Sequence, residues 1–139
     1  MKETIATTQA PQAIGPYSQA VRVGEWLFLS GQIGLDPASG ELVSGGVLAE
    51  ATRVLQNLHA VLAAAGASLD DVARTTIYLV DLTDFGPVNE VYARFFRAPF
   101  PARATVGVAA LPRGARVEID AVARIADSSS PSPAGKGLE

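Results

Sequence analysis

Arg103 and Glu118 are the two residues of this chain whose types and positions most suggest chemistry. Arg103 follows the short segment 100–102, and Glu118 comes fifteen residues later in the alternating segment 117–122. A guanidinium can bind a carboxylate through two parallel hydrogen bonds, and a carboxylate can hold a water molecule and accept its proton. The chain between them is expected to form a tight hairpin, which would place both side chains on neighbouring strands. There they could pair with each other, or hold a carboxylate substrate and a water side by side.

The rest of the chain offers little other reactive chemistry. It has no cysteine, its one histidine is His59, and its only lysines are Lys2 and Lys136 near the two ends. Thiol nucleophiles, thiolate metal sites, serine–histidine–aspartate triads and an internal Schiff-base lysine are therefore excluded or disfavoured. His59 flanks an apolar helical stripe without ligand-like neighbours, so a structural or surface role is expected for it. An enzyme built from this chain would work with arginine, carboxylate, hydroxyl groups, backbone amides and water, and we expect no cofactor and no metal.

Composition indicates one globular domain that needs no disulfide. The chain has 139 residues, of which 48% are hydrophobic and 18% charged, and a formal net charge of −3. Its arginines are spread along the chain, so an electrostatic case for a nucleic-acid partner is weak. We see neither a signal-peptide core nor a run of about 20 apolar residues, and we therefore expect a cytoplasmic protein without membrane contact. We expect the folded domain to span residues 1–126, and residues 127–139, rich in Ser, Pro and Gly, to form a disordered tail.

Two segments repeat apolar residues with helical period. The first predicted helix covers residues 47–65 and ends at Gly66, with Glu50, Arg53 and Asn57 on the face opposite its apolar stripe.

The second predicted helix covers residues from about 84 to 97. Thr83 or Asp84 is expected to cap it, and Pro87 lies in its first turn.

The remaining segments alternate as strands. They are residues 21–23, 26–33, 75–82, 104–111 and 117–125, with 4–7 as a candidate edge strand. The order predicts an α+β fold, one mixed sheet with two helices on the same side. The strands carry apolar residues on both faces, so the face without helices is expected to pack against copies of the same chain.

Four further residues, at three places in the chain, are candidates for a binding site. Tyr17 lies in a Gly-Pro turn, Ser30 and Gly31 end an apolar strand, and Asn89 lies in the first turns of the second helix. Each also has a plain structural explanation: a packed aromatic ring, a bulge where backbone approaches closely, or an exposed helix-start residue.

Five ordered blocks of the chain resemble the RidA family, the YjgF-type reactive-intermediate deaminases. The blocks are residues 14–20, 30–33, 81–85 with 88–89, 100–103 and 117–121. The resemblance implies a fold similar to chorismate mutase, in which two helices cover one face of a mixed sheet. It also implies that three subunits join their sheets into a central barrel, with binding clefts between subunits.

The resemblance also implies roles for single residues. In the family, the arginine at the position of Arg103 grips the substrate carboxylate, and the glutamate at that of Glu118 is assigned to the hydrolytic water. Tyr17, Ser30 and Asn89 match positions that line the cleft, and Gly31 is placed with them.

Thr105 stands where well-known members have a cysteine. Thiol-based side activities are therefore not expected here, whereas the hydrolysis itself should survive, and Thr105 is counted with the substrate-binding residues.

The activity implied is the hydrolytic deamination of 2-imino and enamine acids, such as 2-aminoacrylate and 2-iminobutanoate, to 2-keto acids and ammonia. Two alternatives remain open at this point. One is another small-molecule hydrolase, an endoribonuclease or a translation inhibitor on the same scaffold. The other is a non-catalytic module that binds small carboxylates or a protein partner.

Overall fold

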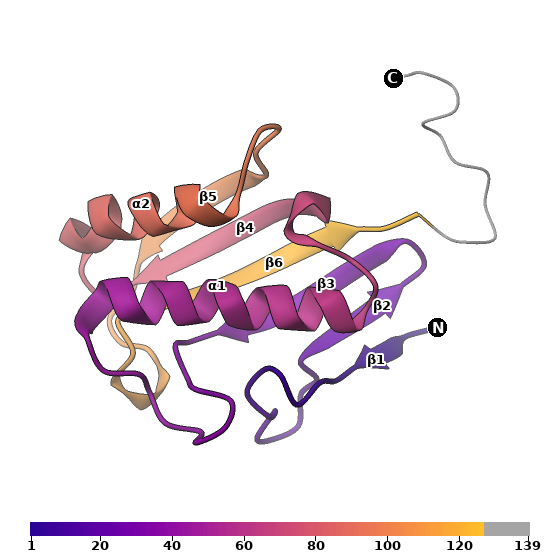
Figure 1. Cartoon of the computed structure of the whole chain (residues 1–139), viewed down its shortest axis with the longest axis horizontal. Helices are drawn as coiled ribbons and strands as arrows, with labels where there is room; N and C mark the ends of the chain where they lie inside the picture. The colour runs from indigo at the N-terminus through magenta and orange to yellow at the C-terminus, as the bar shows by residue number, and fades with distance from the viewer. Residues whose placement is uncertain (127–139) are drawn as a thin grey trace.

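The fold is a six-stranded mixed sheet with two helices on one of its faces (Figure 1). The computed structural model describes residues 1–126, so the expectation of a disordered tail lies outside the described residues. No helix within residues 1–126 has the length and apolar character that crossing a bilayer demands. The strands and helices are β1 (Glu3–Ile5), β2 (Ala20–Val23), β3 (Trp26–Gln32), α1 (Gly46–Ala64), β4 (Val72–Leu79), α2 (Phe85–Phe95), β5 (Ala102–Gly107) and β6 (Val117–Arg124).

The strand order is β1-β2-β3-β6-β4-β5, and it corrects the expected hairpin between the last two strands. β6 pairs with β3 and β4, both antiparallel, so β4 separates it from β5. β5 instead pairs with β4 in parallel, because α2 connects the two strands as a crossover helix. The expected turn at Pro112–Gly114 exists as a single turn of 3-10 helix, but it leads the chain from an edge of the sheet back to its centre.

Alternation along β6 explains why this strand occupies the centre. Val117, Ile119 and Ala123 are fully buried and Ala121 is nearly so, while the residues between them are only partly buried. A strand with a continuous apolar face gains most where helices cover it along its whole length. α1 lies across β3 and β6, and α2 lies beside α1 (Figure 1).

The other sheet face carries no helix among the described residues, as expected. Trp26 and Phe28 of β3 are 42% and 45% exposed, and Val106 of β5 is 40% exposed. The register joins these strands across one surface, because Phe28 lies opposite Val122 and Val106 lies opposite Tyr78. We call this surface the open face.

The bounds of the elements differ from expectation by a few residues, for local reasons. β4 begins at Val72 because a capping box built by Ser68 and Asp71 ends just before it. The second helix begins at Phe85, and Asp84 makes no side-chain cap; the capping aspartate is Asp81, which accepts from Thr83 N in the preceding 3-10 turn. Gly66 follows α1 with a φ of +79° and donates to Ala63 O, which confirms it as the residue that ends the helix.

Glu50 and Asn57 correct the prediction of a polar outer face for α1, because both are buried. Asn57 Nδ2 donates to Leu35 O at 3.0 Å and to Ile33 O at 3.4 Å, and its Oδ1 accepts from Arg53 Nε at 2.9 Å. Glu50 Oε1 accepts from Arg116 N at 2.8 Å. Both side chains thus bind backbone groups outside the strands: Asn57 binds carbonyls just after β3, and Glu50 binds the amide just before β6.

We expect Asn57→Ala to lower the free energy of unfolding by about 2 kcal/mol, because it removes the side-chain donor to the Leu35 carbonyl and leaves Ile33 O with Leu35 N alone. Gln56→Ala is the matched control: Gln56 is exposed on the same helix, and the change should stay within about 0.5 kcal/mol. Chemical denaturation of both variants at one protein concentration measures the difference. Equal stability of the two variants would contradict a structural role for Asn57.

Candidate active site

Arg103 and Glu118 lie on opposite faces of the sheet, which corrects their expected placement side by side. Arg103 pairs with Thr75 of β4, whose buried hydroxyl hydrogen-bonds to Tyr92 of α2, so Arg103 is on the helix-covered face. Glu118 pairs with Tyr78, on the open face. Arg103 and Glu118 are three residues apart along the strands and two strands apart across the sheet, which corresponds to about 10 Å in each direction. One chain therefore holds two separate groups of candidate residues.

The first group surrounds Arg103 at the start of β5. Its Nη1 donates to Asn89 Oδ1 at 2.8 Å, and its Cζ lies 4.8 Å from the ring centre of Tyr92 and 5.4 Å from that of Phe85. The two rings and the amide come from successive turns of α2, so this helix fixes the direction of the guanidinium. Among the described residues Arg103 makes no other side-chain hydrogen bond, which leaves further N–H donors for a planar anion.

Thr105 belongs to the same group. It pairs with Ile77 and lies two residues beyond Arg103, so the two side chains share the helix-covered face of the edge strand. Thr105 is half-buried. Its hydroxyl adds a neutral donor and acceptor beside the guanidinium.

The second group surrounds Glu118 at the start of β6. A hollow of about 390 Å³ is lined by Glu118, Gly31 and Tyr17 together with residues of the Pro112–Gly114 turn. Burial of Glu118, and then the negative charge of Asp120, raises the pKa of the Glu118 carboxyl above that of an ordinary glutamate. A carboxylate with this environment binds protons more readily than one in free solution, as a general base requires.

Gly31 is where the backbone of β3 comes close to that carboxylate. The register between β3 and β6 shifts between Leu29 and Gln32, which is the bulge expected there. A Cβ on Gly31 would lie 2.2 Å from Glu118 Oε2, so a larger residue would displace the carboxylate. The close approach of the Glu118 carboxylate to the β3 backbone therefore favours glycine at position 31, and no unusual φ is involved.

Ser30 lies near the end of β3 and is hydrogen-bonded to the loop before β2. Its Oγ donates to Ser18 O at 2.6 Å and its N donates to Gln19 O at 3.0 Å, so both polar groups hold the loop that carries Tyr17. Tyr17 itself is 54% exposed. Ser30 positions the Tyr17 loop beside the Glu118 hollow.

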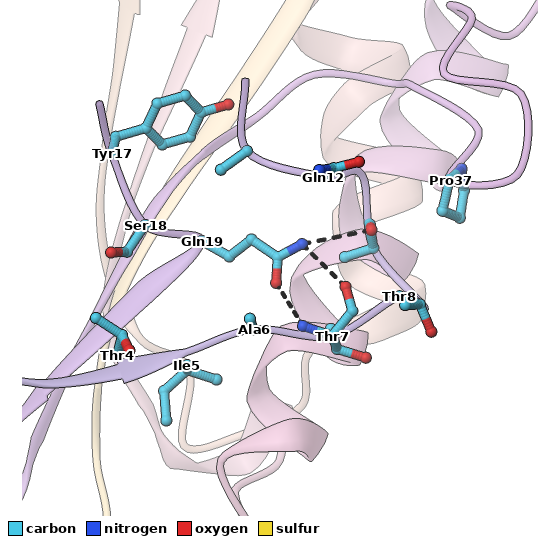
Figure 2. Close-up of a pocket in the computed structure, with 12 residues that line it drawn as sticks. Thr4, Ile5, Ala6, Thr7, Thr8, Gln12, Tyr17, Ser18, Gln19 and Pro37 are labelled. Carbon is cyan, nitrogen blue, oxygen red and sulfur yellow. Dashed lines mark hydrogen bonds between the residues drawn. The ribbon is translucent and has the colours of Figure 1, made fainter. Parts of the chain in front are cut away.

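Gln19 holds the loops beside the site together, although it is not among the predicted binding residues. Figure 2 shows its amide reaching across to the segment after β1. Its Oε1 accepts from Thr7 N at 2.7 Å, and its Nε2 donates to Thr7 O at 3.0 Å and to Pro11 O at 2.7 Å. The sequence shows only a polar residue between two small neighbours in block 14–20, and its burial is seen in the structure alone.

A larger hollow, of about 710 Å³, shares Gln12, Tyr17 and Gln19 with the Glu118 hollow but is lined by neither Arg103 nor Glu118 (Figure 2). It is lined mainly by neutral residues 4–8 and by Tyr17. His59 is exposed on α1 and lines a separate surface hollow. In residues 1–126 no three His, Asp or Glu side chains gather in a way that could hold a metal ion.

The arrangement can therefore orient an anion at one place and hold a water at another. The Arg103 group has an oriented cation, an amide and a hydroxyl; the Glu118 group has a half-buried carboxylate and a phenol. Among the described residues, the Arg103 group contains no base, and the one cation that lines the Glu118 hollow, Arg113, donates to Gly40 O.

Comparison with known proteins matches nearly the whole described chain. The sequence profile of the family described as Endoribonuclease L-PSP matches residues 7–125. The 2-iminobutanoate/2-iminopropanoate deaminase of Mus musculus is 55% identical over 123 residues, which cover 88% of this chain and 91% of the mouse protein.

Solved structures share the fold. A Thermotoga maritima protein superposes with a TM-score of 0.89 at 50% identity, over 91% of this chain and 100% of that one. RidA from an Antarctic Psychrobacter superposes with a TM-score of 0.86 at 48% identity, over 88% of this chain and 99% of that one. The chain belongs to the Endoribonuclease L-PSP family, and with it to the RidA-type proteins that its five sequence blocks resemble.

Proposed function

We propose that this protein hydrolyses 2-imino and enamine acids, such as 2-iminobutanoate and 2-aminoacrylate, to 2-keto acids and ammonia. The observation that carries the proposal is the half-buried Glu118 carboxylate held against Gly31, in a chain 55% identical to the mouse deaminase. The enamine form reaches the same reaction after it takes up a proton at carbon and becomes the iminium. No covalent nucleophile is required, because a protonated iminium is already electrophilic.

In the first step, Arg103 binds the substrate carboxylate and Glu118 accepts a proton from water as the water oxygen bonds to the iminium carbon. The π electrons of the C=N bond move to nitrogen, which gives a neutral carbinolamine and a protonated Glu118. The anchored carboxylate makes this an oriented encounter.

In the second step, Glu118 returns its proton to the amino group. The hydroxyl then loses its proton to Glu118, the carbon–oxygen double bond forms, and the carbon–nitrogen bond breaks to release ammonia. Glu118 thus carries a proton twice and is regenerated when that proton passes to ammonia or solvent, a general acid/base role worth about 10²–10⁴-fold.

We further propose that the site is completed between two subunits of a homotrimer. Arg103 and Glu118 are on opposite faces of one sheet, so a single chain cannot present both to one small substrate. The exposed apolar side chains of the open face support packing of sheet against sheet. In the proposed trimer, the Arg103 group of one subunit meets the Glu118 group of the next.

We expect Glu118→Gln and Arg103→Ala each to lower kcat/KM for 2-iminobutanoate by at least about 100-fold, with the assembly unchanged. Gln keeps the size of the side chain but cannot accept the proton, and Ala removes the carboxylate anchor. The assay couples 2-keto acid formation to a dehydrogenase, and size-exclusion chromatography checks the assembly. A carboxylate-binding module without catalysis would lose ligand binding in the Arg103 variant alone; full activity in either variant rejects the assignment.

Mixing the two inactive variants tests where the site is formed. If Arg103 and Glu118 act from different subunits of a ring, random reassembly restores about one quarter of the sites, since each intact site needs one particular variant on each side. If both residues act within one chain, no site is restored. The measurement is deaminase activity after denaturation and joint refolding of the variants in equal amounts, with each variant refolded alone as the control.

We expect Gly31→Ala to lower kcat by about tenfold or more, because the new methyl group displaces the Glu118 carboxylate. Gly86→Ala is the matched control: no atom lies within 4 Å of a Cβ at Gly86, and its φ is not in the left-handed region. Steady-state kinetics of both variants compare the two glycines. If both variants have near-normal activity, displacement of the Glu118 carboxylate does not affect turnover, and Glu118 is not the base.

Cleavage of RNA is a second candidate, because the matching family is described as Endoribonuclease L-PSP. The chain offers little for it: the net charge is −3, and the only histidine is exposed on α1 and lines another hollow. Phosphate binding of this kind depends steeply on salt, so an RNA-degradation assay across salt concentrations separates it from imine hydrolysis.

A further inference from the structure

We propose that Asp120 and Tyr78 form a positioning pair that sets how readily Glu118 binds and releases its proton. The inference rests on the proposed function, in which Glu118 carries that proton. Neither residue is among those assigned to substrate or water above.

The pair is defined by the register of two central strands. Tyr78 of β4 lies directly opposite Glu118 of β6, and Asp120 lies two residues further along β6 on the same face. The Tyr78 hydroxyl extends diagonally and donates to Asp120 Oδ2 at 2.9 Å. Two residues along a strand place the Cα atoms of Glu118 and Asp120 about 7 Å apart. The Glu118 carboxylate lies against Gly31 of β3, and Asp120 accepts from Tyr78 of β4.

Asp120 is the negative charge that Glu118 faces. Among residues 1–126 of the same chain, the other titratable groups around Glu118 are the phenols of Tyr78 and Tyr17 and the guanidinium of Arg113; the proposed trimer adds Arg103 of the next subunit. Arg113 Nη2 donates to Gly40 O at 3.1 Å, which ties that cation to another loop. A like charge in a half-buried place disfavours the ionised form of Glu118 and so favours its protonated form.

Tyr78 moderates this effect. Its hydroxyl donates to the Asp120 carboxylate and so withdraws part of the negative charge that Glu118 experiences. The hydrogen bond to Asp120, and then burial, raises the pKa of Tyr78, so the phenol remains a donor throughout the neutral range. Asp120 and Tyr78 thus act on Glu118 in opposite directions.

This balance suits a residue that must accept a proton from water and then give it to nitrogen. If the negative charge of Asp120 acted less strongly on Glu118, Glu118 would be a poorer base. If it acted more strongly, Glu118 would already be protonated before the reaction begins. The two variants that break the pair should therefore shift the acid side of the pH profile in opposite directions.

We expect Asp120→Asn, which removes the charge but keeps an acceptor for Tyr78, to move the acid limb of kcat to lower pH. Relative activity one pH unit below the wild-type midpoint should rise about threefold. Tyr78→Phe, which keeps the ring but exposes Glu118 to the full charge, should move the limb to higher pH and lower that relative activity about threefold. Asp120→Glu restores the charge and should return the limb toward its wild-type position.

A direct titration separates this inference from the proposed reaction. The carboxyl ¹³C resonances of the assembled, glutamate-labelled protein are followed with pH, and the Glu118→Gln variant identifies the Glu118 signal. The inference holds if that signal titrates at lower pH in Asp120→Asn and at higher pH in Tyr78→Phe. It is overturned if Glu118 titrates as in the wild type in both variants, or shifts in the same direction in both.

If the Glu118 titration shifts as expected while the pH profile of turnover does not follow, the pair is real and the catalytic role of Glu118 is wrong. If Asp120→Asn does not assemble, the Tyr78→Phe titration alone decides the matter, because the phenyl ring preserves the packing.

Discussion

The position of β6 between β3 and β4 is the constraint on which the rest of the molecule depends. One face of this strand supplies buried apolar residues to the core beneath the helices, and the other carries Glu118 and Asp120. Because side chains alternate along a strand, the packing that buries Ile119 also presents Glu118 and Asp120 to the open face. A shift of one residue in register would exchange the core residues for the carboxylates. The core therefore holds the proposed base in place.

The parallel pairing of β4 and β5 has the complementary effect on the proposed substrate anchor. A crossover through α2 returns the chain beside β4, and its register places Arg103 level with Thr75 beneath that helix. Tyr92 bridges the two, because its hydroxyl binds Thr75 while its ring lies under the guanidinium. The cation is thus oriented by groups that also stabilise the core, so little ordering remains for substrate binding to impose.

These two placements divide the candidate site between the faces of one sheet. Such a division has little use in a monomer but fits an assembly in which the open face, with Trp26 and Phe28 exposed, is covered by another copy. In the proposed trimer, the apolar surface that drives association would bring the Arg103 group of one subunit to the Glu118 group of the next. Activity would then depend on assembly for a geometric reason, because Arg103 and Glu118 lie on opposite faces of one sheet and would reach the same substrate only where two subunits meet.

The sequence by itself was enough for features that depend on neighbours along the chain. These are the two helices with Gly66 at the end of the first, the alternating faces of β6 and the family blocks that contain Arg103 and Glu118. It could not reveal that β4 lies between β5 and β6, nor that Glu50 and Asn57 are buried beneath loops. Strand partners and buried polar contacts join residues far apart in the chain, so no local spacing records them. Tertiary structure decided them because only the folded sheet determines which strand gains most from a central position and which backbone groups remain to be satisfied.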